Sequence, residues 1–170
     1  MKTTELARLE AEKLVRRFGT RDPFLLAERT GVTVLYRNFE AQKGAFSLVL
    51  GLPFIFLNAS LDEHEAAAVL AHELGHSRLH LDLAQKGALC EYDLFNLKTS
   101  VEYEANVFAA HLLIDTDEMQ ECLGQGMDLY ACAGTLNVNV NLLIIELAEM
   151  NRRGGRYALP YLPPNAFMGE

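Results

Sequence analysis

The sequence predicts an α+β fold in which a small β-sheet packs on one central helix and further helices follow. Two observations support this class. The apolar runs at 45–50 and 54–57 are separated by Gly51-Leu52-Pro53, which is the pattern of a β-hairpin. Most of the remaining chain shows apolar residues at helical spacing, bounded by glycine, proline and capping residues. With 170 residues, 50% of them hydrophobic, the chain can form one domain with a sizeable core.

The N-terminal segment is expected to form two helices. Residues 4–18 show a charged amphipathic pattern in which Leu6, Leu9, Leu14 and Val15 form the inward face. Asp22-Pro23 opens a second, short helix, because proline suits the first turn of a helix.

The predicted sheet begins at residues 32–36, whose β-branched and aromatic side chains favour a strand. The hairpin follows after a polar loop. Because the two hairpin runs are nearly continuously apolar, we expect much of both faces of the sheet to be covered.

The next predicted helix contains the motif His72-Glu73-x-x-His76. Histidines four residues apart lie on one face of a helix, so both imidazoles can bind one metal ion. Glu73 is offset from His72 by about 100° and lies beside the ion, where it can take a proton from water. Ser60 and Glu63 have the spacing of a capping box and are expected to start this helix. The motif predicts the metal site of a zinc peptidase.

A catalytic zinc usually has three protein ligands and an open position for water. The downstream candidates for the third ligand are Glu91, Asp93, Glu102, Glu104 and His111.

Helical phase favours Glu102 in the helix predicted at 99–114. Glu102 lies at the edge of the apolar stripe of this helix, whereas Glu104 is expected to project to the opposite, polar side. Asn106, one turn beyond Glu102, can accept a hydrogen bond from the outer nitrogen of a ligand histidine and fix its ring. His80 either lines the cleft or caps the motif helix.

Charge and cysteine content restrict the function further. The net charge of −8 makes the surface poorly suited to binding phosphates, so direct nucleic-acid binding is disfavoured. The three scattered cysteines, Cys90, Cys122 and Cys132, are typical of reduced thiols in a cytosolic protein. The charged N-terminus is no secretory signal, and we expect no membrane-crossing segment.

Two further stretches around the motifs extend the pattern: Ala71-His72-Glu73-Leu74-Gly75-His76, and Glu102-x-x-Ala105-Asn106-x-Phe108-Ala109-Ala110-x-Leu112-Leu113. Over about residues 25–150 the chain resembles the ImmA/IrrE metallo-endopeptidases of bacteria and their mobile elements. The resemblance implies a zincin-like fold, with zinc bound by His72, His76 and Glu102 and with Glu73 as the general base. It also implies a cytoplasmic enzyme that cuts a helix-turn-helix repressor. Many members continue Leu-Leu-Met-Pro where this chain has Leu112-Leu113-Ile114-Asp115, which changes the neighbouring substrate surface.

The expected organisation is a single zincin-like metallopeptidase domain over residues 1–150, followed by an irregular tail. Residues 81–97 lack a clean period and are expected to form an irregular connection. The parts of the domain are N-terminal helices at 4–30, a sheet at 32–57, motif helices at 61–80 and 99–114, C-terminal helices at 115–150, and the tail at 151–170.

Three functions fit these patterns. The first is a zinc-dependent endopeptidase acting on a protein substrate, with Glu73 as the base. The second is a non-catalytic regulator that binds a repressor or another protein and uses the metal to hold two helices together. A carboxylate beside the ion argues against it, because a structural metal site has no use for a base. The third is a DNA-binding regulator that uses the helices at 128–150, which the acidic balance disfavours.

Overall fold

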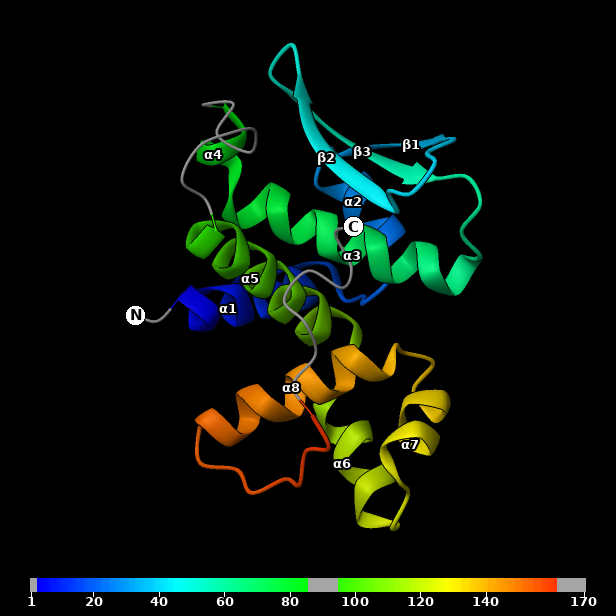
Figure 1. Ribbon diagram of the computed structural model, residues 1–170, viewed down its shortest axis with the longest axis vertical. Coiled ribbons are helices and arrows are strands. Elements are labelled where there is room, and N and C mark those ends of the chain that lie inside the picture. Colours follow the sequence, from blue (N-terminus) through cyan, green and yellow to red (C-terminus); the bar gives the residue numbers. More distant parts are fainter. Residues whose placement is uncertain (1–2, 86–94, 162–170) are drawn as a thin grey trace.

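The computed structural model describes residues 3–85 and 95–161, with the side chains of 95–99 left aside (Figure 1). Its elements in chain order are α1 (Thr3–Phe18), α2 (Pro23–Arg29), β1 (Thr33–Arg37), β2 (Gly44–Val49), β3 (Leu52–Asn58), α3 (Glu63–Leu79), α4 (Leu81–Gln85), α5 (Phe95–Leu113), α6 (Thr116–Gly124), α7 (Leu129–Thr135) and α8 (Val140–Arg152). The predicted α+β, zincin-like class, with a small sheet on the motif helix and a helical C-terminal part, is confirmed.

The elements are stacked along the long axis of the molecule. The sheet lies at one end, α3 lies beneath it, α1 and α5 come next, and α6, α7 and α8 fill the other end (Figure 1). The helix α3 contacts both β2 and β3 above it and α5 below it, and α5 in turn packs on α1 and α8. The motif helix is therefore enclosed, and every residue from Ala68 to His76 is buried.

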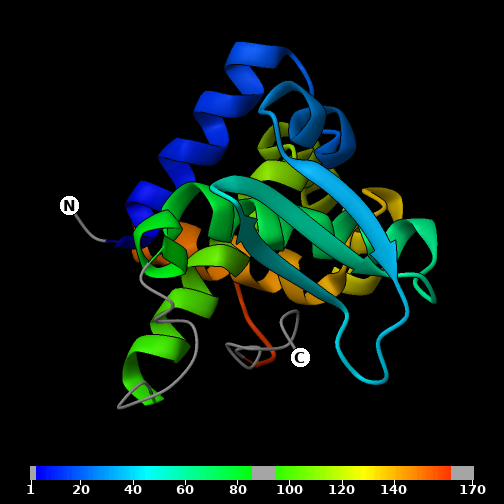
Figure 2. The ribbon, with the colours of Figure 1, turned by 90° about the horizontal axis from the view of Figure 1, so that it is seen from above.

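The sheet has the strand order β1-β3-β2, with β1 parallel and β2 antiparallel to β3. The predicted hairpin is present, and its turn uses Leu50 and Gly51, both at positive φ. The expectation that both faces are covered is wrong. Helices pack on one face only, and among the described residues none covers the outer face (Figure 2). Leu35 on β1, which pairs with Phe56 on β3, is therefore exposed.

The predicted inward face of α1 is confirmed at Leu14 and at Val15, which packs on the core, and is wrong at Leu6 and Leu9. Its buried residues are Ala7, Ala11 and Leu14, whereas Leu6 and Leu9 are partly exposed. Helix α1 packs on α5, and the small alanine side chains on its buried face suit a close contact between helices.

The predicted start is confirmed for α2 and wrong for α3. Asp22 caps α2 as expected, accepting hydrogen bonds from Phe24 N and Leu25 N. The capping box predicted for α3 is wrong. Asp62 is the N-cap, with its carboxylate accepting from Glu65 N, and Ser60 instead bonds to the side chain of Asn58.

The connection predicted at 81–97 is partly helical. Residues 81–85 form α4, and α5 already begins at Phe95, while 86–94 lie outside the described residues. The predicted C-terminal helices at 115–150 are present as α6, α7 and α8, and α6 is capped by Asp115. Cys122 and Cys132 are buried free thiols, and Cys90 lies outside the described residues.

No single helix in the described ranges is long and apolar enough to cross a membrane. Only α7 and α8 taken together pass that test of length and composition, and they meet at a bend of 109°.

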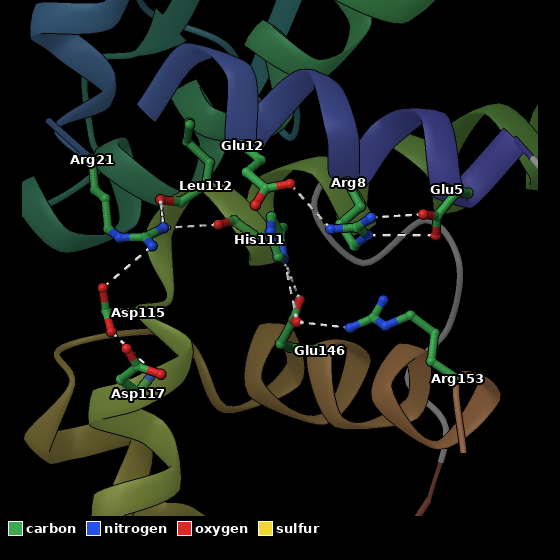
Figure 3. Close-up of polar contacts among 10 residues, drawn as sticks. All are labelled: Glu5, Arg8, Glu12, Arg21, His111, Leu112, Asp115, Asp117, Glu146 and Arg153. Carbon is green, nitrogen blue, oxygen red and sulfur yellow. Dashed lines mark hydrogen bonds and ion pairs between the residues drawn. The ribbon is translucent and has the colours of Figure 1, made fainter. Parts of the chain in front are cut away.

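A cluster of charged side chains joins the N-terminal helices to the C-terminal ones (Figure 3). Arg21 donates to the carbonyl oxygens of His111 and Leu112 at the end of α5 and pairs with Asp115 at 3.3 Å. His111 Nδ1 lies 3.3 Å from the buried carboxylate of Glu146 on α8. Asp115 thus caps α6 and ties it to Arg21.

Candidate metal centre

Three side chains converge between α3 and α5. His72 and His76 come from consecutive turns of α3, and their Nε2 atoms lie 3.0 Å apart. Glu102 reaches them from α5, with Oε2 at 3.2 Å from His72 Nε2 and Oε1 at 3.5 Å from His76 Nε2. Among the described residues these three form the group that can hold a metal ion.

The separations fit a tetrahedral zinc ion. With bonds of about 2.0–2.2 Å, two ligand atoms of a tetrahedral site lie about 3.3–3.5 Å apart, close to the three separations found. Glu102 Oε2 is buried and has no hydrogen-bond partner among the described residues. A buried carboxylate oxygen without a partner is costly, and a bound cation would remove that cost. The three residues therefore fit the zinc ion that the His-Glu-x-x-His motif predicts.

The close crossing of α3 and α5 brings the third side chain within reach. A Cβ atom on Gly75 would lie only 3.1 Å from Ala105 Cα and 3.2 Å from Ala105 O. These distances are shorter than most Cβ contacts, so a larger residue would force the backbone of α5 to shift. The glycine in the middle of the motif helix is thus explained by packing.

The electrostatics favour a cation at the centre. Burial acts to raise the pKa of Glu102, but its contacts with His72 and His76 outweigh this and hold the pKa far below its usual value. Burial likewise acts to lower the pKa of His72, yet the contact with Glu102 and the charge of Glu73 leave it raised. The carboxylates that favour a proton on His72 also favour a metal ion there.

Glu73 lies beside this centre and is not part of the metal-binding group. Its side chain is almost fully buried, and the start of β2 passes directly over it. A Cβ atom on Gly44 would lie 3.4 Å from Glu73 Oε1 and 2.5 Å from Val69 Cγ1. Gly44 therefore lets the edge strand β2 approach the motif helix at the carboxylate, a role that the sequence did not reveal.

Both histidines also have a partner at Nδ1, the ring nitrogen away from the metal-binding group. His72 Nδ1 lies 2.7 Å from Asn106 Oδ1, as predicted, so the ring donates to the amide oxygen. His76 Nδ1 lies 3.0 Å from His80 Nδ1, and His80 Nε2 lies 3.1 Å from Glu104 Oε2. His80 is the C-cap of α3 and is buried against these groups.

Glu104 differs from its prediction. It was expected on the polar side of α5, yet its side chain is only 13% exposed and bonds to His80. The C-terminal end of α3 covers that side of α5, which single-helix phase could not show. Of the other candidate ligands, His111 pairs with Glu146 away from the centre, and Glu91 and Asp93 lie outside the described residues.

A small sheet on a helix with two histidine ligands, and a carboxylate from the next long helix, define the zincin-like class of metallopeptidases. The chain belongs to the M78 peptidase family, because the model of the IrrE N-terminal-like domain matches residues 27–147. The chain is also similar to "Uncharacterized immunity region protein 2" of Bacillus phage phi105. The two are 30% identical over 110 residues, which cover 64% of this chain and 68% of the phage protein.

Proposed function

We propose that this protein is a zinc-dependent endopeptidase in which His72, His76 and Glu102 hold the metal and Glu73 is the general base. The observation that carries the proposal is a buried carboxylate, Glu73, adjacent to the ligand group but outside it. Zn²⁺, when bound, lowers the pKa of water and polarises the peptide carbonyl. The metallopeptidase family supports the same reaction class.

Glu73 has two tasks in the reaction. Its carboxylate takes a proton from the attacking water and then delivers it to the nitrogen of the leaving amine, so it ends the cycle ionised. Burial beneath β2 keeps the carboxylate in one place and limits competition from bulk water.

The substrate would bind as an extended segment along β2. This strand is an edge of the sheet, and Gly44 places its start directly over Glu73. Addition of a strand to a sheet edge supplies backbone hydrogen bonds with little demand on sequence. Selection of the target would then depend on contacts with the folded protein outside the cleaved segment.

We further propose that the target is a helix-turn-helix repressor in the cytoplasm. The name of the phage relative refers to an immunity region, and the family resemblance implies repressor cleavage. The protein need not touch DNA to relieve repression, which agrees with its net charge of −8. The competing function, a non-catalytic regulator, is favoured only by the fact that the metal would join α3 to α5.

Glu73→Gln separates the two functions. The amide keeps the size of the side chain but cannot accept the proton, so cleavage should fall by about 10²–10⁴-fold. Zinc content, measured by metal analysis, should equal that of the parent. The assay incubates the zinc-loaded protein with purified helix-turn-helix repressors from the same genome and follows the fragments by mass spectrometry.

The same variant should still bind the repressor, because the docking surface is unchanged. Undiminished cleavage by Glu73→Gln, or intact repressor with the zinc-loaded parent, would contradict the peptidase proposal. In the second case, repressor binding that requires zinc would support the regulator instead.

A further inference from the structure

The Nδ1 atoms of the two ligand histidines contact different groups. His72 meets a neutral amide, whereas His76 meets a chain of two side chains, His80 and then Glu104. Ser100 extends the chain by donating from Oγ to Glu104 Oε1 at 2.9 Å. The proposed peptidase mechanism assigns no task to either His80 or Glu104.

The contacts of Glu104 fix which nitrogen of His80 carries the hydrogen. An ionised carboxylate only accepts hydrogen bonds, so His80 Nε2, at 3.1 Å, must be the donor. A neutral imidazole with hydrogen on Nε2 has a bare Nδ1 that can only accept.

The same logic continues to the metal ligand. His80 Nδ1 accepts, so His76 Nδ1, at 3.0 Å, must donate and must carry the hydrogen. His76 Nε2 is then bare and faces Glu102 and His72 Nε2. A bare Nε2 is the form that a metal ion needs from this ring.

The positions of the two groups are fixed by the fold. The backbone N–H of His80 donates to His76 O at 2.9 Å and ends α3, which sets where the ring of His80 can lie. Its partner Glu104 stands on α5, two residues from Glu102. His80 is 4% exposed, so water hardly competes for these bonds.

We propose that His80 and Glu104 are positioning residues that hold the hydrogen of His76 on Nδ1 and thereby present a bare Nε2 to the metal. This inference rests on the metal site of the proposed function. Its effect is on zinc affinity, with no direct contact with substrate. Comparable partners behind metal ligands contribute ten- to a hundredfold in affinity.

The first test determines directly which ring nitrogen of His76 carries the hydrogen. In ¹⁵N-histidine NMR spectra of the metal-free protein at pH about 8.5, above the ordinary imidazole pKa, His76 should carry its hydrogen on Nδ1. Glu104→Gln keeps the size of the side chain, but its amide can donate as well as accept, so His76 should become a mixture of the two forms. A parent with the hydrogen on His76 Nε2, or a variant with the spectrum of the parent, would overturn the inference.

The second test measures zinc dissociation constants by competition with a chelator. His80→Ala should weaken zinc binding by about ten- to a hundredfold and Glu104→Gln by a smaller factor. The double variant should lose no more than His80→Ala alone, because Glu104 acts only through His80. Unchanged zinc affinity in both single variants would contradict the proposed roles of His80 and Glu104. A double variant whose loss of zinc affinity is the product of the two single losses would contradict them too. If His80→Ala does not fold, Glu104→Gln alone decides.

A matched control is available on the same helix. His111 on α5 pairs with Glu146 on α8 (Figure 3), which is a partly buried histidine–glutamate contact outside the metal-binding group. His111→Ala should lower the melting temperature and leave zinc affinity within about twofold of the parent. An equal loss of zinc affinity in this control would show that loosening α5 explains the effect. If the parent itself binds no zinc while the NMR result holds, the proposed function fails and the assignment of the hydrogen stands.

Discussion

Glu102 and Glu104 stand two residues apart on α5 and meet different histidines. Glu102 reaches His72 and His76 directly, whereas Glu104 reaches His76 only through His80. One is therefore placed to bind the metal, and the other to orient a ligand.

This difference predicts unequal effects on zinc affinity. Glu102→Ala removes a ligand and should abolish tight zinc binding, as seen by chelator competition. Glu104→Ala removes only an outer contact and should cost no more than about a hundredfold. Equal losses in the two variants, or the reverse order, would show that the third ligand is assigned to the wrong glutamate.

Asn106 permits a test on the other histidine. Asn106→Ala removes the acceptor for His72 Nδ1 at 2.7 Å and should weaken zinc binding by about ten- to a hundredfold. Circular dichroism should show a folded domain. A variant with the zinc affinity of the parent would contradict a role for Asn106 at the centre.

Sequence reasoning located the residues whose spacing within one helix determines their place. The separation of His72 and His76 by four residues, and the helical phase of Glu102, suffice because both follow from helix geometry. His80 and Glu104 could not be paired in this way, since their contact depends on how α3 and α5 cross. The zinc itself, and the roles of the five predicted site residues, stay predictions.

At the scale of elements, the contact between α3 and α5 depends on Gly75. Gly75→Ala would gain about 0.5–1 kcal/mol from helix propensity but would push a methyl group against Ala105 backbone atoms at 3.1–3.2 Å. Overpacking of this kind costs about 1–3 kcal/mol, so we expect net destabilisation in urea unfolding. Zinc affinity should fall as well, because α5 would move Glu102 away from the histidines.

Gly134 provides the control for this prediction. It lies within α7, is exposed, and a Cβ atom there would meet nothing within 4 Å. Gly134→Ala should therefore stabilise the protein by about 0.5–1 kcal/mol and leave zinc affinity unchanged. If Gly75→Ala stabilises the protein as Gly134→Ala does, the close approach of α3 and α5 is not limiting.

Element prediction failed where tertiary neighbours decide which face is covered. The hairpin runs are nearly continuously apolar, yet helices cover only one face of the sheet. On α1 the predicted inward residues Leu6 and Leu9 are exposed, whereas Ala7 and Ala11 are buried. The cap of α2 was located more reliably, because an Asp side chain bonds within its own segment.

At the scale of the whole molecule, the metal centre joins two layers. His72 and His76 belong to the helix under the sheet, and Glu102 belongs to the helix that packs on α1 and α8. A metal ion bound by all three would bind the folded state and not the unfolded chain, so zinc should stabilise the entire domain.

The size of this effect follows from linkage. At free zinc about 1,000-fold above the dissociation constant, the folded state gains roughly 4 kcal/mol. For a chain of 170 residues, where 1 kcal/mol shifts the melting temperature by about 2–4 °C, zinc should raise it by roughly 8–16 °C. Differential scanning calorimetry with buffered zinc, and then with chelator, measures the shift. Glu73→Gln should show the shift of the parent, because Glu73 is outside the ligand group, whereas His72→Ala should show almost none. Equal shifts in the parent and His72→Ala would place the zinc somewhere other than between α3 and α5.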